Sequence, residues 1–291
     1  MTQIPRQFMG QDPQFAQVDR AKVVLVPVPY DATTSARPGT RQGPEAILQA
    51  SLQLEDYDLE TGDEAVSRGI AVAAPLEPDV SGPEKMVARV ERRCSELHER
   101  GKFVFTVGGE HSVTVGAARA AKAHHGELSF LQIDAHMDLR DSFEGSPYSH
   151  ACTARRLWEM GDVVAVGIRD GSAEEHRWAQ ERGAPVFWGW DLCGRRDDSW
   201  MDEVVEALGA KVYVTFDVDG LDSAVMPATG TPEPGGLGYW QVLRLLRKVA
   251  EDRDVVACDL CELSPAPGQH ASDYTAARLV YKMITYFTRP K

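Results

Sequence analysis

The side chains best suited to chemistry fall into four short groups along the chain. They are His111 after two glycines, the triplet Asp134, His136 and Asp138, the pair Asp217 and Asp219, and the single Glu262. In an extended backbone alternate residues point to the same side, so each of the two spaced groups brings its side chains together. Imidazole and carboxylate groups are metal ligands, and the chemistry that such a set favours is metal-assisted hydrolysis.

The first three groups offer more ligands than one ion takes. A tetrahedral zinc site in an enzyme uses three protein ligands and a water. Two divalent cations about 3.5–4 Å apart, joined by shared carboxylates, would use the whole set. Carboxylates and imidazoles without a thiolate form a hard donor set, which favours Mn²⁺. The pattern therefore predicts two Mn²⁺ ions per chain.

Each group also has an ordinary structural interpretation. A lone Asp-x-Asp after a strand is commonly a turn or a helix cap, and His111 could simply lie at the start of a helix. Capping does not explain all three groups at once, each at the end of a strand in one α/β chain. The combination therefore favours the metal site over the ordinary interpretation.

Short β-rich runs alternate with helical patterns along nearly the whole chain. Strands are predicted at 22–27, 70–74, 102–107, 128–134, 163–168, 185–188, 211–216 and 255–260. Helices are predicted at 45–54, 84–100, 112–123, 152–160, 173–182, 201–210, 238–250 and 272–286. Ser272 or Asp273 is the predicted N-cap of the last helix.

This alternation predicts one α/β domain over residues 1–291, with an extended amino-terminal segment over 1–20. The domain is a doubly wound, mostly parallel sheet with helices on both faces. Ligands bind such sheets at the carboxyl ends of the strands. Every one of the four groups directly follows a predicted strand, so the fold is expected to bring them to one edge of the sheet.

The composition narrows the class of protein. Of the 291 residues, 31 are Lys or Arg and 44 are Asp or Glu; the net charge of −13 argues against nucleic acid as a partner. No apolar run approaches the ~20 residues of a membrane span, and residues 1–20 contain no apolar signal core. Five scattered cysteines do not form a disulfide framework. A reduced, cytoplasmic protein with no membrane partner is expected.

The remaining motifs favour structural roles. Cys258 and Cys261 have the spacing of a zinc knuckle, but no second pair follows, so strand packing is expected. The two glycines before Glu110 match neither common phosphate-binding pattern. His124 and His125 lie at a predicted helix end, where a solvated cap is the expected role.

The motifs resemble those of the ureohydrolases, the arginase and agmatinase family, and agmatinases most of all. They are ARPGTRQGPEAI (36–47), GGEHS (108–112), DAHMDLR (134–140), FEGSPYSHA (143–151), FDVDGLDSAVMPATGTPEPGG (216–236) and CELSP (261–265). They follow the family's order from about residue 24 to residue 286. The resemblance implies an arginase-like three-layer sandwich and an enzyme that hydrolyses C–N bonds in linear amidines.

The resemblance also implies roles for individual residues. In the family's arrangement, His111, Asp134, Asp138 and Asp217 would hold one manganese ion, and Asp134, His136, Asp217 and Asp219 the other. His150 matches the family's proton-shuttling histidine, and Glu262 matches the carboxylate that receives the substrate guanidinium. Thr231 lies on a Gly-Thr-Pro turn that lines the pocket. Asp138 and then His150 are the expected proton donors to the leaving amine.

Three positions depart from the family pattern. Ser223 stands where proline is usual, and Ala228 and Ala151 stand where glycine is common. None is a ligand position, so the departures concern loop geometry and the surroundings of His150 rather than the metal centre.

The expected substrate is a small cationic guanidine. Arginase-like members resemble one another in an asparagine-containing loop before the histidine that matches His150, and this chain contains no asparagine. Agmatine, hydrolysed to putrescine and urea in polyamine biosynthesis, is therefore the first expectation, with Glu144 and Asp141 near the pocket mouth. Aminopropylagmatine, guanidinobutyrate, free guanidine and arginine remain alternatives, and Arg37, Arg41 and Arg140 would suit a carboxylate-bearing substrate.

Two alternatives lie outside the ureohydrolases. A zinc deacetylase-like hydrolase would use a single ion, yet the outer ligands His111 and Asp138 are both present. A catalytically inactive binding protein would not need the intact set of ligands. By resemblance alone, a homotrimer or homohexamer is expected.

Overall fold

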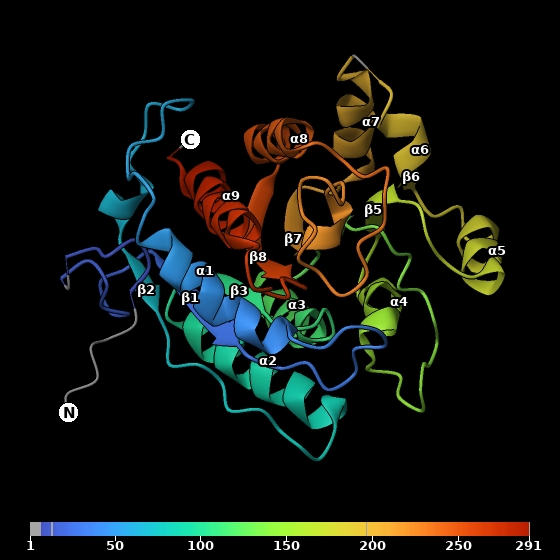
Figure 1. Ribbon diagram of the computed structural model, residues 1–291, viewed down its shortest axis with the longest axis horizontal. Coiled ribbons are helices and arrows are strands. Elements are labelled where there is room, and N and C mark those ends of the chain that lie inside the picture. The colour runs from blue at the N-terminus through green and yellow to red at the C-terminus, as the bar shows by residue number, and fades with distance from the viewer. Residues whose placement is uncertain (1–6, 13, 196, 291) are drawn as a thin grey trace.

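The computed structural model describes residues 7–12, 14–195 and 197–290. In this part of the chain eight strands form one parallel sheet in the order β2-β1-β3-β8-β7-β4-β5-β6 (Figure 1). The strands are β1 (Val23–Val28), β2 (Ile70–Val72), β3 (Phe103–Gly108), β4 (Ser129–Ile133), β5 (Val163–Ile168), β6 (Val186–Trp188), β7 (Lys211–Asp217) and β8 (Asp254–Cys261). The predicted strands and the doubly wound fold are confirmed.

The helices connect successive strands, except α9, which follows the last strand, and they cover both faces of the sheet. They are α1 (Gly43–Ser51), α2 (Pro83–Glu99), α3 (Val113–His125), α4 (Thr153–Trp158), α5 (Ala173–Glu181), α6 (Gly189–Leu192), α7 (Ser199–Ala207), α8 (Tyr239–Asp252) and α9 (His270–Thr288). Figure 1 shows α8 and α9 on one side of the sheet and α2 on the other. The predicted helices are present, and the one that the sequence missed, α6, is too short to show a helical period.

The predicted cap of the last helix is wrong. Helix α9 begins at His270, and Gln269 is its N-cap residue. Ser272 therefore lies inside the first turn, where its backbone N–H already donates to the carbonyl of Gln269. The hydroxyl of Ser272 is buried without a hydrogen-bonding partner in the described part of the chain.

Alternation along the strands builds a core on each face. Val23 and Leu25 belong to one hydrophobic cluster with residues of α1, α7, α8 and α9, whereas Val24 and Val26 belong to another with residues of α2 and α3. Strand β1 is therefore buried along its whole length, as are most of the central strands, which explains their continuous apolar runs. Cys258 and Cys261 are buried on opposite faces of β8, which confirms their packing role.

The strand order decides where the chemistry lies. The first three strands form one half of the sheet and β4–β6 the other, and β7 and β8 fill the gap between them. Strands β3, β8, β7 and β4 are therefore neighbours in the middle of the sheet. Their carboxyl ends carry the four groups of candidate residues and form the crevice in which α/β folds bind ligands.

The described part of the expected amino-terminal segment, residues 7–12 and 14–20, makes turns, and Phe8 is buried in the core. Residues 1–6 and 13 lie outside the described part. Among the helices described, none has the length and apolar character needed to cross a bilayer.

Candidate metal centre

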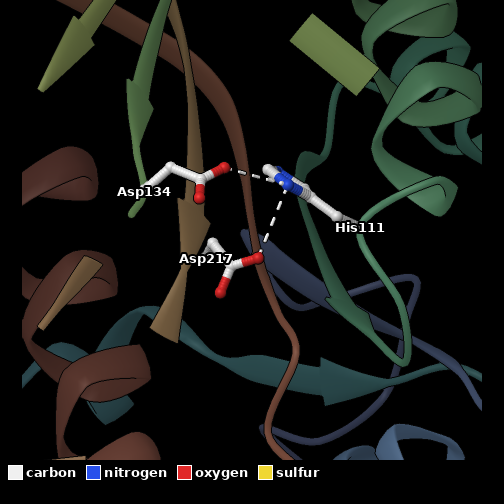
Figure 2. Close-up of side chains that lie close together, drawn as sticks. All are labelled: His111, Asp134 and Asp217. Atoms are coloured by element: carbon white, nitrogen blue, oxygen red, sulfur yellow. Dashed lines mark ion pairs between the residues drawn. The ribbon is translucent and has the colours of Figure 1, made fainter. Parts of the chain in front are cut away.

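The imidazole of His111 lies among three carboxylates. Its Nδ1 atom is 3.0 Å from Asp138 Oδ2, 3.2 Å from Asp134 Oδ2 and 3.5 Å from Asp217 Oδ2. Figure 2 shows the His111 ring directed between the carboxylates of Asp134 and Asp217, which come from neighbouring strand ends. His111, Asp134 and Asp217 thus offer ligand atoms close enough together to hold one cation.

A second group shares Asp134. The Nδ1 atom of His136 is 3.0 Å from Asp219 Oδ2 and 3.7 Å from Asp134 Oδ1. Asp134, His136 and Asp219 could therefore hold another cation beside the first. The sequence-based set is thus brought together, with Asp134 common to both groups. Asp217 faces the His111 group, and the structure does not place it within the second group.

Backbone amides and one glutamine hold these carboxylates in place. The N–H of His136 donates to Asp134 (2.7 Å), that of Ala135 to Asp219 (3.0 Å), and that of Asp219 to Asp217 (2.9 Å). The Gln132 amide donates to Asp134 Oδ2 at 2.9 Å. The ligand positions are therefore fixed by the turns that follow β4 and β7.

The buried carboxyl groups of the cluster would be stabilised by added positive charge. Burial opposes a charge on His111, but its hydrogen bonds to Asp134 and Asp138 raise the pKa of this imidazole well above its usual value. Burial, together with the negative charge of Asp134, raises the pKa of Asp138 to about 7. Burial and the charge of Asp219 likewise raise the pKa of Asp217. These carboxyl groups resist ionising together, and divalent cations would remove that conflict.

The far side of the His111 ring supports the same interpretation. Its Nε2 atom is 2.8 Å from the Thr215 hydroxyl, which donates to Asp259 Oδ1 at 2.8 Å. Because the single hydroxyl proton goes to Asp259, Thr215 accepts the Nε2–H of His111. With a cation among the carboxylates, Nδ1 would give up its proton and turn its lone pair to the metal, in the tautomer that metal-binding histidines use. The residues present therefore fit a divalent metal centre.

A cavity of about 260 Å³ opens over this cluster. Glu262, His150 and Thr231 line it together with five of the six predicted ligands, which are His111, His136, Asp138, Asp217 and Asp219. Asp134 lies beneath them and is fully buried. Glu144 is exposed and is not among the lining residues, so the structure does not bring it to the site.

Glu262 and Thr231 are held in different ways. Glu262 has a left-handed backbone (φ 68°), and its Oε1 accepts the backbone N–H of His111 at 2.6 Å. Its other oxygen accepts no hydrogen bond within the described ranges. The Thr231 hydroxyl is 3.4 Å from Asp219 Oδ2, so this residue touches the metal cluster.

His150 lies at the side of the cavity, at the start of a short 3₁₀ turn (His150–Cys152). Its Nε2 is 3.3 Å from the Ser35 hydroxyl and its Nδ1 is 3.4 Å from the Thr33 hydroxyl. Burial lowers the pKa of His150 to about 4, so the imidazole is neutral at neutral pH.

Sequence reasoning missed several polar residues of the site. Thr215 and Asp259 lie inside apolar strands and showed no motif, although a polar residue in such a run is itself a signal. Asp170, which lines the cavity, and Glu233 come close to His136, forming a third group from separate loops. Asp170 Oδ2 is 3.8 Å from His136 Nε2, and its side chain is 57% exposed.

Comparisons with known proteins agree on one family. The profile of the arginase family matches residues 21–285. The N(1)-aminopropylagmatine ureohydrolase of Synechocystis sp. is 41% identical over 97% of this chain and 94% of its own length. The corresponding enzyme of Thermus thermophilus is 44% identical over 92% of this chain and 91% of its own. The crystal structure of the agmatine ureohydrolase of Thermoplasma volcanium superimposes with a TM-score of 0.87 at 31% identity, covering 99% of this chain and 96% of that one.

Proposed function

The chain belongs to the arginase family, and from that premise we propose that it hydrolyses the guanidino group of a cationic polyamine precursor to urea and an amine. The observation that carries the proposal is the convergence of the candidate ligands with Glu262 on one cavity. A cation centre beside a carboxylate is suited to attack on a guanidinium carbon, because one activates water and the other holds the substrate.

We propose two Mn²⁺ ions as the cofactor. His111, Asp134, Asp138 and Asp217 would hold one, and Asp134, His136, Asp217 and Asp219 the other. When bound, the pair supplies a nucleophile near neutral pH by lowering the pKa of water. The carboxylate-rich, thiolate-free set of donors supports manganese over zinc.

The residues of this chain would position the substrate and transfer protons to the leaving group. Glu262 pairs with the guanidinium by accepting charge-assisted hydrogen bonds at its unpartnered oxygen, and it directs the carbon toward the cluster. Asp138 and then His150 supply the proton that the leaving amine needs; the His150 ring, neutral at rest, first takes up a proton from solvent and then gives it to the amine. His150 is suited to the second step, since its ring lines the cavity without contacting the cluster directly.

We propose N(1)-aminopropylagmatine as the substrate, with agmatine second. The relatives from Synechocystis and Thermus thermophilus, both above 40% identity, carry the former name, and the solved structure from Thermoplasma volcanium, at 31% identity, carries the latter. Asp170, which lines the cavity, and Glu233 next to it support a substrate whose tail carries ammonium groups, because they place negative charge beside His136. Arg140 lines the cavity as well, but its guanidinium is engaged by Glu175 (3.6 Å) and by the ring of Phe143.

The test is urea release by the Mn²⁺-loaded protein from N(1)-aminopropylagmatine, agmatine, guanidinobutyrate, arginine and free guanidine. The highest kcat/KM is expected for N(1)-aminopropylagmatine, and Asp134→Asn should abolish urea release. Asp162→Asn, which replaces an exposed carboxylate far from the cavity, should behave as the unaltered protein. Urea from none of these compounds, despite bound metal, would overturn the proposal and favour a deacetylase-like hydrolase or an inactive binding protein.

A further inference from the structure

Thr33 joins a buried carboxylate to the proposed proton donor. The Thr33 hydroxyl donates to Glu110 Oε1 at 2.6 Å, and Thr33 Oγ1 accepts the backbone N–H of His150 at 3.0 Å. It also lies 3.4 Å from the Nδ1 atom of His150. Glu110, Thr33 and His150 thus form a continuous chain of hydrogen bonds that ends at the cavity.

The carboxylate end of this chain is built into the protein. Glu110 is fully buried, and both its oxygens accept hydrogen bonds from donors on two loops. The N–H of Thr33 donates to Oε2 at 2.6 Å, and the hydroxyls of Thr33 and Ser112 donate to Oε1. No Lys or Arg of the described residues forms an ion pair with Glu110. The groups that stabilise its carboxylate are the hydroxyls of Thr33 and Ser112 and the amide of Thr33.

The two loops that carry Glu110 and Thr33 are locked together. Gly109 approaches the loop after β1 so closely that a Cβ atom there would lie 1.9 Å from the carbonyl oxygen of Tyr30. The N–H of Glu110 donates to that carbonyl at 2.8 Å. Asp31 closes the loop around Thr33 by accepting the N–H groups of Gly39 and Arg41. Thr33 is therefore fixed before any substrate enters.

The number of protons available to the hydrogen bonds between Glu110, Thr33 and His150 determines which ring nitrogen of His150 carries its proton. The hydroxyl of Thr33 has one proton, and Glu110 takes it because a carboxylate only accepts. Thr33 Oγ1 must then act as an acceptor toward His150, so the ring carries its proton on Nδ1. Ser149 Oγ, also 3.4 Å from Nδ1, is a hydroxyl that can accept in the same way. The lone pair of the neutral ring is thus left on Nε2, near Ser35.

We propose that Thr33, held by Glu110, is a positioning residue that fixes the tautomer of His150 and favours its protonated form. This inference rests on the proposed function, in which His150 gives a proton to the leaving amine. The same arrangement occurs at His111, where Asp259 and Thr215 fix the opposite nitrogen. Because the Glu110 carboxylate holds the Thr33 hydroxyl as an acceptor, it would lower the free energy of the His150 imidazolium that forms during each turnover.

The test compares Thr33→Val with Thr33→Ser in steady-state urea release. The valine variant keeps the shape but loses the hydroxyl, and kcat should fall about 10- to 100-fold with little change in KM. The serine variant keeps the hydroxyl and should restore kcat to within about threefold. Thr61→Val is the matched control, because the N–H and hydroxyl of Thr61 both donate to one carboxylate, Asp58, away from the cavity.

The pH profile separates positioning from a general loss of structure. Thr33→Val removes the acceptor at Nδ1 that is held by Glu110 and leaves only Ser149 Oγ there, which makes the imidazolium less favourable, so the limb of the profile that belongs to His150 should move to lower pH. His111, His136 and Asp134 also act on His150 through space, but Thr33→Val leaves them in place. In a His150→Ala background, Thr33→Val should cause no further loss.

The outcomes are distinct. An unchanged kcat and pH profile in Thr33→Val would overturn the inference, as would failure of the serine variant to restore activity or a further loss on the His150→Ala background. If the valine variant does not fold, Thr33→Ala is judged by the same criteria. Absence of urea release from the unaltered protein would instead count against the proposed function itself.

Discussion

The Nε2 atom of His111 lies 2.8 Å from the hydroxyl oxygen of Thr215, on the side of the ring that faces away from the carboxylate cluster. This contact joins a candidate metal ligand to the interior of the sheet, because Thr215 donates in turn to Asp259 of the neighbouring strand β8. Tyr213 holds the other oxygen of Asp259 at 2.7 Å. A metal ligand on one loop is thus oriented by residues of two strands.

Thr215→Val should weaken Mn²⁺ binding about 10- to 100-fold, since outer partners orient a histidine ligand and fix its tautomer. Binding would be measured by titrating the metal-free protein with Mn²⁺. Thr215→Ser should retain the affinity. Thr285→Val removes a buried hydroxyl of α9 that bonds only to its own helix, and serves as the control. Equal affinity in the valine variant and the control would show that this contact does not orient the ligand.

Removal of the metal should destabilise the protein, because four carboxylates of the cluster then lose their cations. At a free metal concentration of about 100 times Kd, binding contributes about 2.7 kcal/mol, which for a chain of this length corresponds to about 4 °C in Tm. The measurement is thermal unfolding with and without a chelator. Asp134→Asn should largely abolish the difference, since both groups share Asp134. A chelator-insensitive Tm in the unaltered protein would contradict a bound metal.

The negative charge beside His136 should affect long polyamine substrates selectively. Asp170→Asn and Glu233→Gln are each expected to raise KM for N(1)-aminopropylagmatine about two- to fivefold, because an exposed ion pair contributes about 1 kcal/mol or less. Free guanidine lacks a charged tail and should be affected less. Glu127→Gln, on the opposite end of the sheet, is the control. A similar rise in KM for both substrates would place the effect on the guanidinium end instead.

His98 makes stability depend on pH outside the metal centre. Its ring is buried, and neither nitrogen has a hydrogen-bonding partner among the described residues. Burial, with a smaller contribution from the neighbouring His125 and His124, lowers the pKa of His98 to about 3. Between about pH 3 and pH 6.5 the unfolded chain therefore binds a proton at His98 that the folded chain does not. The free energy of unfolding is highest above pH 6.5 and decreases as the pH falls toward 3.

The free energy of unfolding should fall with a slope of up to about 1.4 kcal/mol per pH unit from this group below pH 6.5. Urea unfolding of the chelator-treated protein at pH 7 and pH 5 measures it, and His98→Leu should reduce the difference between the two values. His176→Gln, at an exposed position, should not. Identical pH dependence in the protein with and without His98 would show that its protonation is not coupled to folding.

The tertiary structure corrected or extended the sequence-based picture at particular places. The helix start at His270 could not be read from the chain, because Ser272 and Asp273 are good caps whose use depends on where the preceding loop leaves the sheet. Glu144 lies near His150 in sequence but is exposed, since the loop around it turns away from the cavity at a left-handed residue (φ 49°). The acidic pair of Asp170 and Glu233 forms only because two loops meet.

The sequence by itself determined the parts of this protein that depend on neighbours along the chain. Strand periodicity, the placement of polar groups at strand ends and the spacing of Asp134, His136 and Asp138 are local properties, so they predicted the parallel sheet and the candidate ligands. Only the tertiary structure decided which distant residues support them. Glu110 and Thr33 are separated by 77 positions, and Thr215 and Asp259 by 44, and their hydrogen bonds exist because strand order brings these segments together. These hydrogen bonds are buried, and burial strengthens them, because a carboxylate orients a histidine strongly only where water is excluded.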